Sequence, residues 1–233
     1  MLCSWLIDWP SWAGPVAHFI LHTGLPLTAK IAAASVIAST VVGIVLGTLL
    51  TIDFLPSRAL IRLYIEVWRG LPLIVTLFMT FFALPVTALH WRFSPWVAAS
   101  IALTLWGSAQ VAEATHGAVQ SIPREQHEAA AALGFGWVGR HAFVILPQAF
   151  RRLLPPLVSL LVNVIQNTTI ASLIGAIEVL GAAESQETRL AGPPPAGIVE
   201  IHAVEIYGGA MLLFFAISFP LTRLAGYLER RLL

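Results

Sequence analysis

Long apolar stretches separated by short polar segments dominate the pattern along this chain of 233 residues. A helix needs roughly 20 mainly apolar residues to cross a bilayer. Five stretches meet that length, at about 27–52, 72–90, 95–117, 155–177 and 204–224. The pattern therefore predicts an all-α integral membrane fold with about five transmembrane helices, carried by one membrane domain of residues 27–233.

The N-terminal segment 1–26 is less uniformly apolar than the rest of the chain. Trp5, Trp9 and Trp12 occur there with Asp8 and Pro10 among them. Tryptophan-rich segments of this kind suit the membrane–water interface. We expect residues 1–26 to form an N-terminal interfacial segment, with a sixth span as the alternative. A cleaved signal peptide is not expected, because the chain begins without a positively charged region.

Composition supports a membrane protein. The chain is 58% hydrophobic and 11% charged, with a mean hydropathy of +0.82, well above that of a soluble domain. A net charge of +1 does not favour nucleic acid as a partner. A single cysteine, Cys3, excludes an intrachain disulfide.

The distribution of basic residues predicts the orientation. Five spans place the two termini on opposite sides, and cytoplasmic loops of membrane proteins are enriched in arginine and lysine. With a cytoplasmic C-terminus, the opposite face keeps only Lys30, Arg92 and Arg189, and ten arginines lie inside. We therefore expect an external N-terminus, cytoplasmic segments at 53–70 and 118–154, and an external segment at 178–203.

The longest cytoplasmic segment has the composition of a helix. Residues 124–133 are mostly good helix formers that follow Pro123 and end before Gly134, a residue suited to a helix C-cap. A second helical stretch containing Trp137 and His141 precedes Pro147. An alanine run beside Glu128 would let another protein approach closely. The residues alone leave two interpretations open: a docking surface, or a connector that packs on its own spans.

A spacing match then favours docking. Glu128-Ala129-Ala130, Gly134, Val144 and Leu146-Pro147 match the pattern of the EAA loop, so the segment resembles that loop in the membrane subunits of ABC importers. Residues 64–73, Tyr-Ile-Glu-Val-Trp-Arg-Gly-Leu-Pro-Leu, are similar to a segment of the polar amino acid permeases of that class. The resemblance covers roughly residues 27–231.

The resemblance implies a type-1 ABC transporter transmembrane domain over residues 27–233, located as a multi-pass protein in the bacterial plasma (inner) membrane among membrane lipid. It implies three protein partners: a cytoplasmic ABC ATPase dimer, a second permease subunit that is identical or different, and an extracytoplasmic solute-binding protein. The coupling residues that it implies are Glu128, Ala129, Ala130, Gly134, Leu146 and Pro147.

ATP hydrolysis is expected from a separate subunit. A P-loop requires Gly-Lys-Ser/Thr, and the single lysine, Lys30, stands between Ala29 and Ile31. We therefore expect no enzyme activity and no cofactor bound by this chain, with ATP and Mg²⁺ used by the partner ATPase. His127-Glu128 does not continue into a zinc motif, because position 131 is alanine.

Polar residues inside the predicted spans are candidates for a substrate path, since such groups face a bundle interior or a water-filled cavity. Asn163, Gln166 and Asn167 share one helical face, followed by Thr168, and the third span carries Glu113. The alternative for such groups is hydrogen bonding between helices. The related permeases commonly have Lys-Asp-Thr-Ser-Leu where this chain has Gln166-Asn167-Thr168-Thr169-Ile170. Either the solute differs, or a second permease subunit supplies the charge.

These observations predict the permease subunit of an ATP-driven importer, which forms an alternating-access path for an amino acid or a related small polar solute. The alternative from another class is an ATP-independent secondary transporter or channel, for which inverted repeats or paired intramembrane charges would be expected. Gly43 and Gly47 form a GxxxG spacing that predicts close packing of the first span against a neighbour.

Overall fold

The computed structural model describes residues 10–52, 55–86, 93–191 and 202–232, and the regular elements within these ranges are all helices. They are, in chain order, α1 (Ala13–Phe19), the π-helical turn η1 (Ile20–Gly24), α2 (Leu25–Leu49), α3 (Leu55–Gly70), α4 (Leu73–Phe78), the π-helical turn η2 (Met79–Ala83), α5 (Pro95–Gln120), α6 (Arg124–Ala132), α7 (Trp137–Arg140), the π-helical turn η4 (His141–Ile145), α8 (Leu146–Asn167), the 3₁₀ helix η5 (Thr168–Ile174), α9 (Val179–Ala191) and α10 (Ala203–Leu232).

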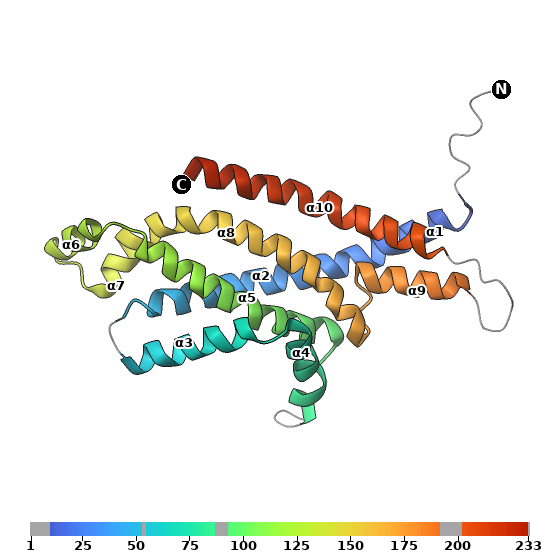
Figure 1. Cartoon of the computed structure of the whole chain (residues 1–233), viewed down its shortest axis with the longest axis horizontal. Helices are drawn as coiled ribbons and strands as arrows, with labels where there is room; N and C mark the ends of the chain where they lie inside the picture. Colours follow the sequence, from blue (N-terminus) through green and yellow to red (C-terminus); the bar gives the residue numbers. More distant parts are fainter. Residues whose placement is uncertain (1–9, 53–54, 87–92, 192–201, 233) are drawn as a thin grey trace.

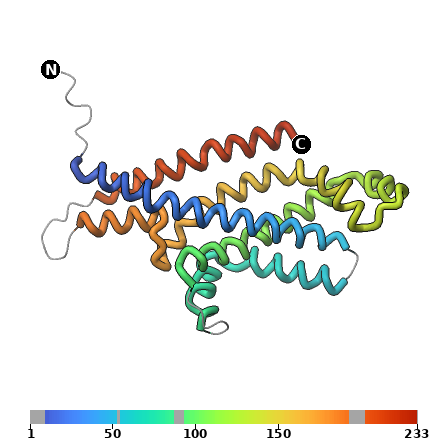
Figure 2. The backbone as a smooth tube through the Cα atoms, turned by 180° about the vertical axis from the view of Figure 1, so that it is seen from behind, coloured from blue at the N-terminus to red at the C-terminus, as the bar shows by residue number. Residues whose placement is uncertain are grey.

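The helices form an elongated bundle in which α2, α3, α5, α8 and α10 run along the long axis (Figure 1). The short helices α6 and α7 lie at one end, called here the α6 end, and α9 lies at the other, the α9 end. Helix α1 begins at the α9 end and α10 finishes at the α6 end, and the reverse view agrees (Figure 2). The bundle is therefore traversed an odd number of times, as five spans require.

Three helices of the described chain are long and apolar enough to cross a membrane by themselves: Ala13–Leu49, Trp137–Ile174 and Ala203–Leu232. A fourth results if α3 and the helix Leu73–Ala83 count as one bent span. Helix α5 has 26 residues, about 39 Å at about 1.5 Å per residue, which exceeds the bilayer core. The prediction of about five spans agrees with these helices when α5 and the bent pair are both included.

Helix α5 is the central helix of the bundle. It packs against α2, α3, α4 and α8, and it is rich in buried small residues such as Ala98, Ala102 and Ala112. Because neighbouring helices shield it, α5 can hold polar side chains that a lipid-facing helix could not. Ser108, Thr115 and His116 are buried on α5 in this way.

The contact between α2 and α5 is the close approach that the GxxxG spacing predicts. A side chain on Gly43 would begin 2.8 Å from the backbone oxygen of Ser108, and one on Gly47 would meet the backbone oxygen of Ala112. On the other helix, Gly107 faces the Ser39 hydroxyl in the same way. Small residues therefore face one another across this interface, as in other membrane helix pairs whose association depends on van der Waals packing.

The segment 53–70, expected to be cytoplasmic and to lie between two spans, is helical from Leu55 to Gly70. Helix α3 runs antiparallel to α5, and the Tyr64 hydroxyl lies 2.7 Å from Ser108 Oγ. After Gly70 the chain bends by 103° into α4, because Pro72 lacks an N–H and disfavours helical geometry at the residue before it. The predicted span 72–90 is described only to residue 86, and this part is too short to cross a bilayer alone.

The predicted boundary at residue 26 does not coincide with a break in the structure. Helices α1 and α2 are joined through η1 into one continuous helix, Ala13–Leu49. Val16 and Ile20 of its first turns pack with Val179 of α9 and Ile206 of α10 in an apolar cluster. Packing against α9 and α10 stabilises the first helix on the N-terminal side of the apolar stretch 27–52. Interfacial placement of the segment stays a prediction, and residues 1–9 lie outside the described residues.

Helix α9 occupies the segment expected to be external. Glu178 begins it as a buried cap: its Oε1 accepts from the Gly181 N–H at 2.9 Å, and Thr28 Oγ1 of α2 donates to its Oε2 at 3.4 Å. A carboxylate at a helix N-terminus satisfies backbone N–H groups that have no partner within the helix. This cap attaches α9 to the first helix. The Gly192–Pro195 turn lies outside the described residues.

Candidate functional site

The loop at the α6 end has the local geometry predicted from its residues. Helix α6 begins directly after Pro123. Gly134 has a φ of +84°, in the left-handed region that glycine adopts without strain. The Phe135 N–H then bonds to the Ala130 oxygen at 3.1 Å, and the Gly134 N–H bonds to the Ala131 oxygen at 2.9 Å. This pair of bonds closes the helix, so the predicted helix and its C-cap are confirmed.

The second half of the loop is rigidly joined to a span. Helix α7, η4 and α8 form one helix, Trp137–Ile174, so residues 137–154 of the expected loop are the start of α8's own helix. His141 of this helix is buried. Its Nε2 lies 3.0 Å from Thr51 Oγ1, just after the end of α2, and its Nδ1 lies 2.9 Å from the Trp137 backbone oxygen. A force on α7 would therefore reach both α8 and α2.

His127 of α6 packs edge-on against the ring of His141, at 6.1 Å between ring centroids. Desolvation by burial lowers the pKa of His127 below its ordinary value of 6.5, and the positive charge of Arg140 lowers that pKa further. The imidazole is thus kept neutral near pH 7, which suits a side chain that packs between α6 and η4.

The predicted coupling residues occupy three kinds of position. Glu128 and Ala129 are exposed on α6, and Gly134 is exposed at the turn. Ala130 is 2% exposed, so its side chain packs inside the loop and shapes it. Leu146 and Pro147 form the first turn of the α8 segment, where Leu146 packs on the buried cluster around Ile145 and Ala149.

Exposed apolar side chains surround the Gly134 turn, and sequence reasoning missed them. Leu133 is 78% exposed, Val138 71% and Phe143 74%, with Phe135 beside Phe143. Exposed apolar residues grouped around a turn at the end of the bundle are typical of a surface that binds another protein. The signal was present in the sequence as large apolar residues in a loop, but only the fold brings them together.

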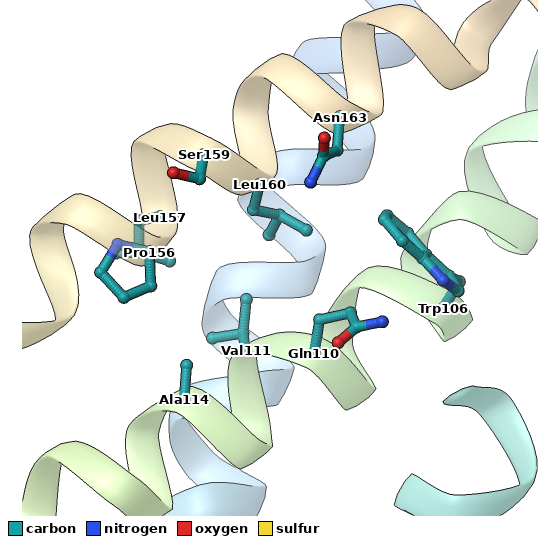
Figure 3. Close-up of a pocket in the computed structure, with 9 residues that line it drawn as sticks. All are labelled: Trp106, Gln110, Val111, Ala114, Pro156, Leu157, Ser159, Leu160 and Asn163. Carbon is teal, nitrogen blue, oxygen red and sulfur yellow. The ribbon is translucent and has the colours of Figure 1, made fainter. Parts of the chain in front are cut away.

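A cleft of about 310 Å³ separates α5 from α8 in the middle of the bundle (Figure 3). Two amides line it from opposite sides, Gln110 on α5 and Asn163 on α8, with Trp106 as a further lining residue. The remaining lining residues are Val111, Ala114, Pro156, Leu157, Ser159 and Leu160. No charged side chain of the described chain lines this cleft. Its size is at the lower end of small-ligand sites.

The other amide positions of α8 lie beyond this cleft. Helix α8 ends at Asn167, whose Nδ2 donates to the Asn163 backbone oxygen at 2.9 Å. Gln166 is exposed, whereas Thr168 is fully buried and bonds to the Ile165 oxygen. The chain tightens here into η5. The structure thus brings Asn163 to the cleft with Gln110 and keeps Gln166, Asn167 and Thr168 at the helix end.

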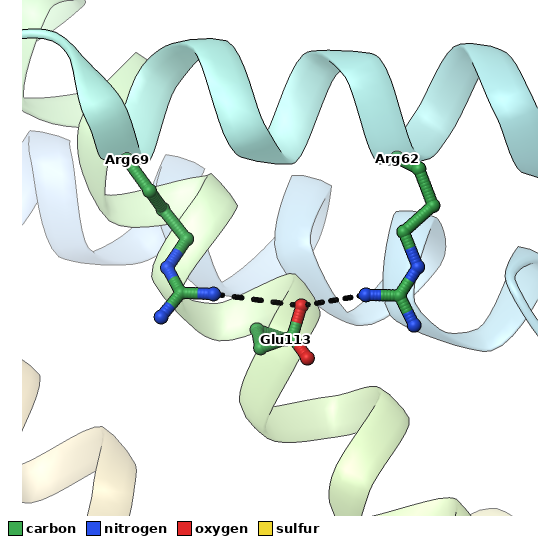
Figure 4. Close-up of polar contacts among 3 residues, drawn as sticks. All are labelled: Arg62, Arg69 and Glu113. Carbon is green, nitrogen blue, oxygen red and sulfur yellow. Dashed lines mark hydrogen bonds and ion pairs between the residues drawn. The ribbon is translucent and has the colours of Figure 1, made fainter.

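Glu113 does not line the cleft and instead pairs with α3 (Figure 4). Its Oε2 lies 3.2 Å from Arg62 Nη1 and 3.6 Å from Arg69 Nη1. The two guanidinium groups therefore share one carboxylate, which holds α3 against α5. The family-like segment at 64–73 includes Arg69, but its partner on a later helix could not be read from that segment.

Replacing Glu113 with glutamine is expected to loosen α3, because two guanidinium groups lose their shared counter-charge. The side chains are 36% to 44% exposed, so we expect a loss of about 1 kcal/mol, or roughly 2–4 °C in the unfolding temperature. Thermal unfolding of the purified chain in detergent would measure it. The matched control is Glu66→Gln, an exposed residue of α3. Equal shifts in both variants would contradict the role of Glu113.

Within the described ranges, no group of three or more histidine, cysteine, aspartate or glutamate side chains is placed to hold a metal ion. His18 and His22 stack with ring centroids 4.1 Å apart on the first helix. Two such ligands fall short of the four that a structural zinc site uses.

Comparison with known proteins identifies relatives over most of the chain. A family model described as "Binding-protein-dependent transport system inner membrane component" matches residues 39–233. The chain is 32% identical over 211 residues to the probable glutamine ABC transporter permease protein GlnP of Bacillus subtilis (strain 168), which covers 91% of this chain and 93% of that relative. It is 31% identical over 232 residues to the glutamine transport system permease protein GlnP of Escherichia coli (strain K12), covering 100% and 99%.

Solved structures show the same arrangement of helices. "Crystal structure of an amino acid ABC transporter with histidines" superposes with a TM-score of 0.78 at 25% identity, covering 97% of this chain and 99% of that chain. An inward-facing structure of the MetNI methionine ABC transporter superposes with a TM-score of 0.75 at 17% identity, over 95% and 99%. The second likeness concerns the fold alone.

Proposed function

Because the chain belongs to the family of binding-protein-dependent transport system inner membrane components, we propose that it forms half of the path by which an ATP-driven importer moves a neutral polar amino acid inward. The observation that carries this proposal is the cleft with Gln110 and Asn163 on facing helices. Amides at membrane depth are costly unless they face a polar path or a partner. Neutral amides suit a solute with an uncharged polar side chain.

A second permease subunit is part of the proposal. Asn163 and Gln166 are exposed on a helix that is otherwise apolar enough to cross the membrane. Exposure to lipid would leave these amides without hydrogen-bonding partners. A second subunit, identical or not, would cover this face and complete the path, and it could supply the charge that Asn167 lacks.

The α6 end is the proposed cytoplasmic side. Helix α6, the first turns of α8 and the last turns of α10 lie at this end, and they carry Arg124, Arg151, Arg152 and Arg230, in agreement with the enrichment of arginine in cytoplasmic loops. A cytoplasmic ATPase dimer would dock on the exposed loop around Glu128 and Gly134, and an extracytoplasmic binding protein would deliver the solute at the α9 end. This chain would bind no cofactor, and ATP with Mg²⁺ would be used by the ATPase.

Transport assays test this proposal. The chain and the subunits that co-purify with it are reconstituted in proteoliposomes. Uptake of radiolabelled glutamine and other amino acids is measured with and without ATP on the side of the membrane that the ATPase faces. Asn163→Leu removes one amide from the cleft. We expect its KM for the transported amino acid to rise about tenfold, because one solute hydrogen bond is worth about 1–1.5 kcal/mol.

The matched control is Thr222→Val in α10, which removes a hydroxyl that donates to the Ser218 oxygen of its own helix. An unchanged KM in Asn163→Leu, or an equal change in the control, would remove Asn163 from the path. Uptake that proceeds without ATP, by a chain that captures no ATPase, would instead support the ATP-independent alternative.

A further inference from the structure

A second cleft lies at the α6 end of the bundle, away from the amide path. It has a volume of about 350 Å³ between the end of α2, the first turns of α3 and the last turns of α5. Its lining consists of Leu50, Leu55, Arg58, Ala59, Arg62 and His116. Neither the transport path nor the loop around Gly134 includes any of these residues. We refer to it as the arginine cleft.

Two guanidinium groups line the arginine cleft. Arg58 and Arg62 both line it, and no carboxylate of the described chain does. Glu113 lies nearby, but Arg62 and Arg69 share that single carboxylate, so these three residues leave one positive charge in excess. The first turn of α3 also lines the cleft, and the N-terminus of a helix attracts anions through its N–H groups and its dipole.

His116 gives an independent indication of a ligand. Its side chain is 5% exposed and lines the cleft, and its Nδ1 has no hydrogen-bond partner among the described residues. Buried polar atoms almost always have a partner in folded proteins. An oxygen-rich anion between the two arginines would provide one, because an imidazole nitrogen that carries a proton donates to such an oxygen.

The apolar part of the lining indicates what kind of anion fits. Leu50 and Leu55 lie beside the arginines. On α3, Leu60 and Leu63 are 70% and 58% exposed, which suits contact with acyl chains in a bilayer. Phosphate and apolar groups in one ligand are the chemistry of a phospholipid. At the proposed cytoplasmic side, anionic lipids attract arginine and lysine residues near the membrane surface.

We propose that the arginine cleft binds the phosphate headgroup of an anionic phospholipid from the cytoplasmic leaflet. Arg58 and Arg62 contact the phosphate oxygens, His116 is the third polar contact, and Leu50 and Leu55 contact the glycerol and the upper acyl chain. The bound lipid joins the start of α3 to the end of α5. It thereby supports the same helix pair that Glu113 connects farther along the bundle.

Native mass spectrometry of the full chain in detergent tests this binding. The protein is titrated with phosphatidylglycerol and, separately, with phosphatidylcholine of identical acyl chains, and an inorganic phosphate arm distinguishes free phosphate from lipid. We expect phosphatidylglycerol to bind more tightly than phosphatidylcholine. Arg58→Gln should weaken phosphatidylglycerol binding about fivefold, since a basic residue near an anionic lipid surface contributes about 1 kcal/mol.

A second variant leaves both arginines in place: Ala59→Glu puts a carboxylate on an exposed position of the same lining, and it should weaken binding at least as much. The control is Arg223→Gln, in the C-terminal half of α10 and outside the cleft, which should bind phosphatidylglycerol like the native chain. Equal affinity for the two lipids, an equal loss in the control, or displacement of lipid by equimolar inorganic phosphate would overturn the proposal.

Discussion

Replacing Gly47 with valine is expected to disrupt the bundle more than any other substitution described for this chain. A Cβ at this position would meet the backbone oxygen of Ala112 and would lie 2.6 Å from Thr115 Cβ. A backbone oxygen cannot rotate away as the end of a flexible side chain can. Helices α2 and α5 would have to separate along an interface whose stability depends on close packing.

Overpacking of this kind costs about 3 kcal/mol or more, which corresponds to roughly 6–12 °C in the unfolding temperature of a chain of this size. The measurement is thermal unfolding in detergent, together with the fraction of the chain that is monodisperse by size-exclusion chromatography. Gly226→Val in α10 is the control, because a Cβ there has no atom within 4 Å. A Gly47→Val protein as stable as the control would show that α2 and α5 are not in close contact.

Reversing the charge of Glu128 is expected to reduce coupled transport strongly while leaving the fold intact. Glu128 is exposed on α6, and its ion pair with Arg124, at 2.9 Å, joins side chains that are 65% and 88% exposed. A pair this exposed contributes at most about 1 kcal/mol to stability. At a protein interface, a charged residue central to the contact contributes about 2 kcal/mol. We therefore expect Glu128→Lys to remain folded and to lose docking of the ATPase.

Glu128→Lys should lower ATP-dependent uptake, and capture of the ATPase by the purified chain, by about tenfold or more. Glu125→Lys is the matched control, since it reverses a charge at another exposed position of the same helix. Both variants are compared with the native chain in unfolding temperature, uptake and ATPase capture. Equal capture of the ATPase by native chain and Glu128→Lys would exclude Glu128 from the docking contact.

Local features of the candidate site were predictable because neighbouring residues determine them. Pro123 precedes the start of α6, and Gly134 ends it in the left-handed conformation, which glycine adopts without strain. The GxxxG pair likewise identified the packing face of α2. The span boundaries were less predictable, because α3 carries Arg58, Arg62 and Arg69 and looks like a polar loop until its partner on α5 is known.

Positions that depend on two helices could not be predicted from one. Asn163 and Gln110 were visible as polar residues in predicted spans, but only the packing of α8 on α5 places them across a common cleft. Glu113 was a candidate for the substrate path, whereas the structure pairs it with Arg62 and Arg69. Helical periodicity gives the face of a residue on its own helix and leaves open which neighbour that face meets.

By itself the sequence determined the membrane class, the all-helical fold, the helix and turn around Gly134 and the lack of a P-loop in this chain, because hydrophobic length, helix-capping residues and motif spacing are local properties. The tertiary structure alone decided that α3 lies along α5, that Ala130 is buried while Leu133 and Phe143 are exposed, and that Arg58, Arg62 and His116 line one cleft. Those outcomes depend on contacts between residues far apart in the chain, which packing energy selects and local propensity does not.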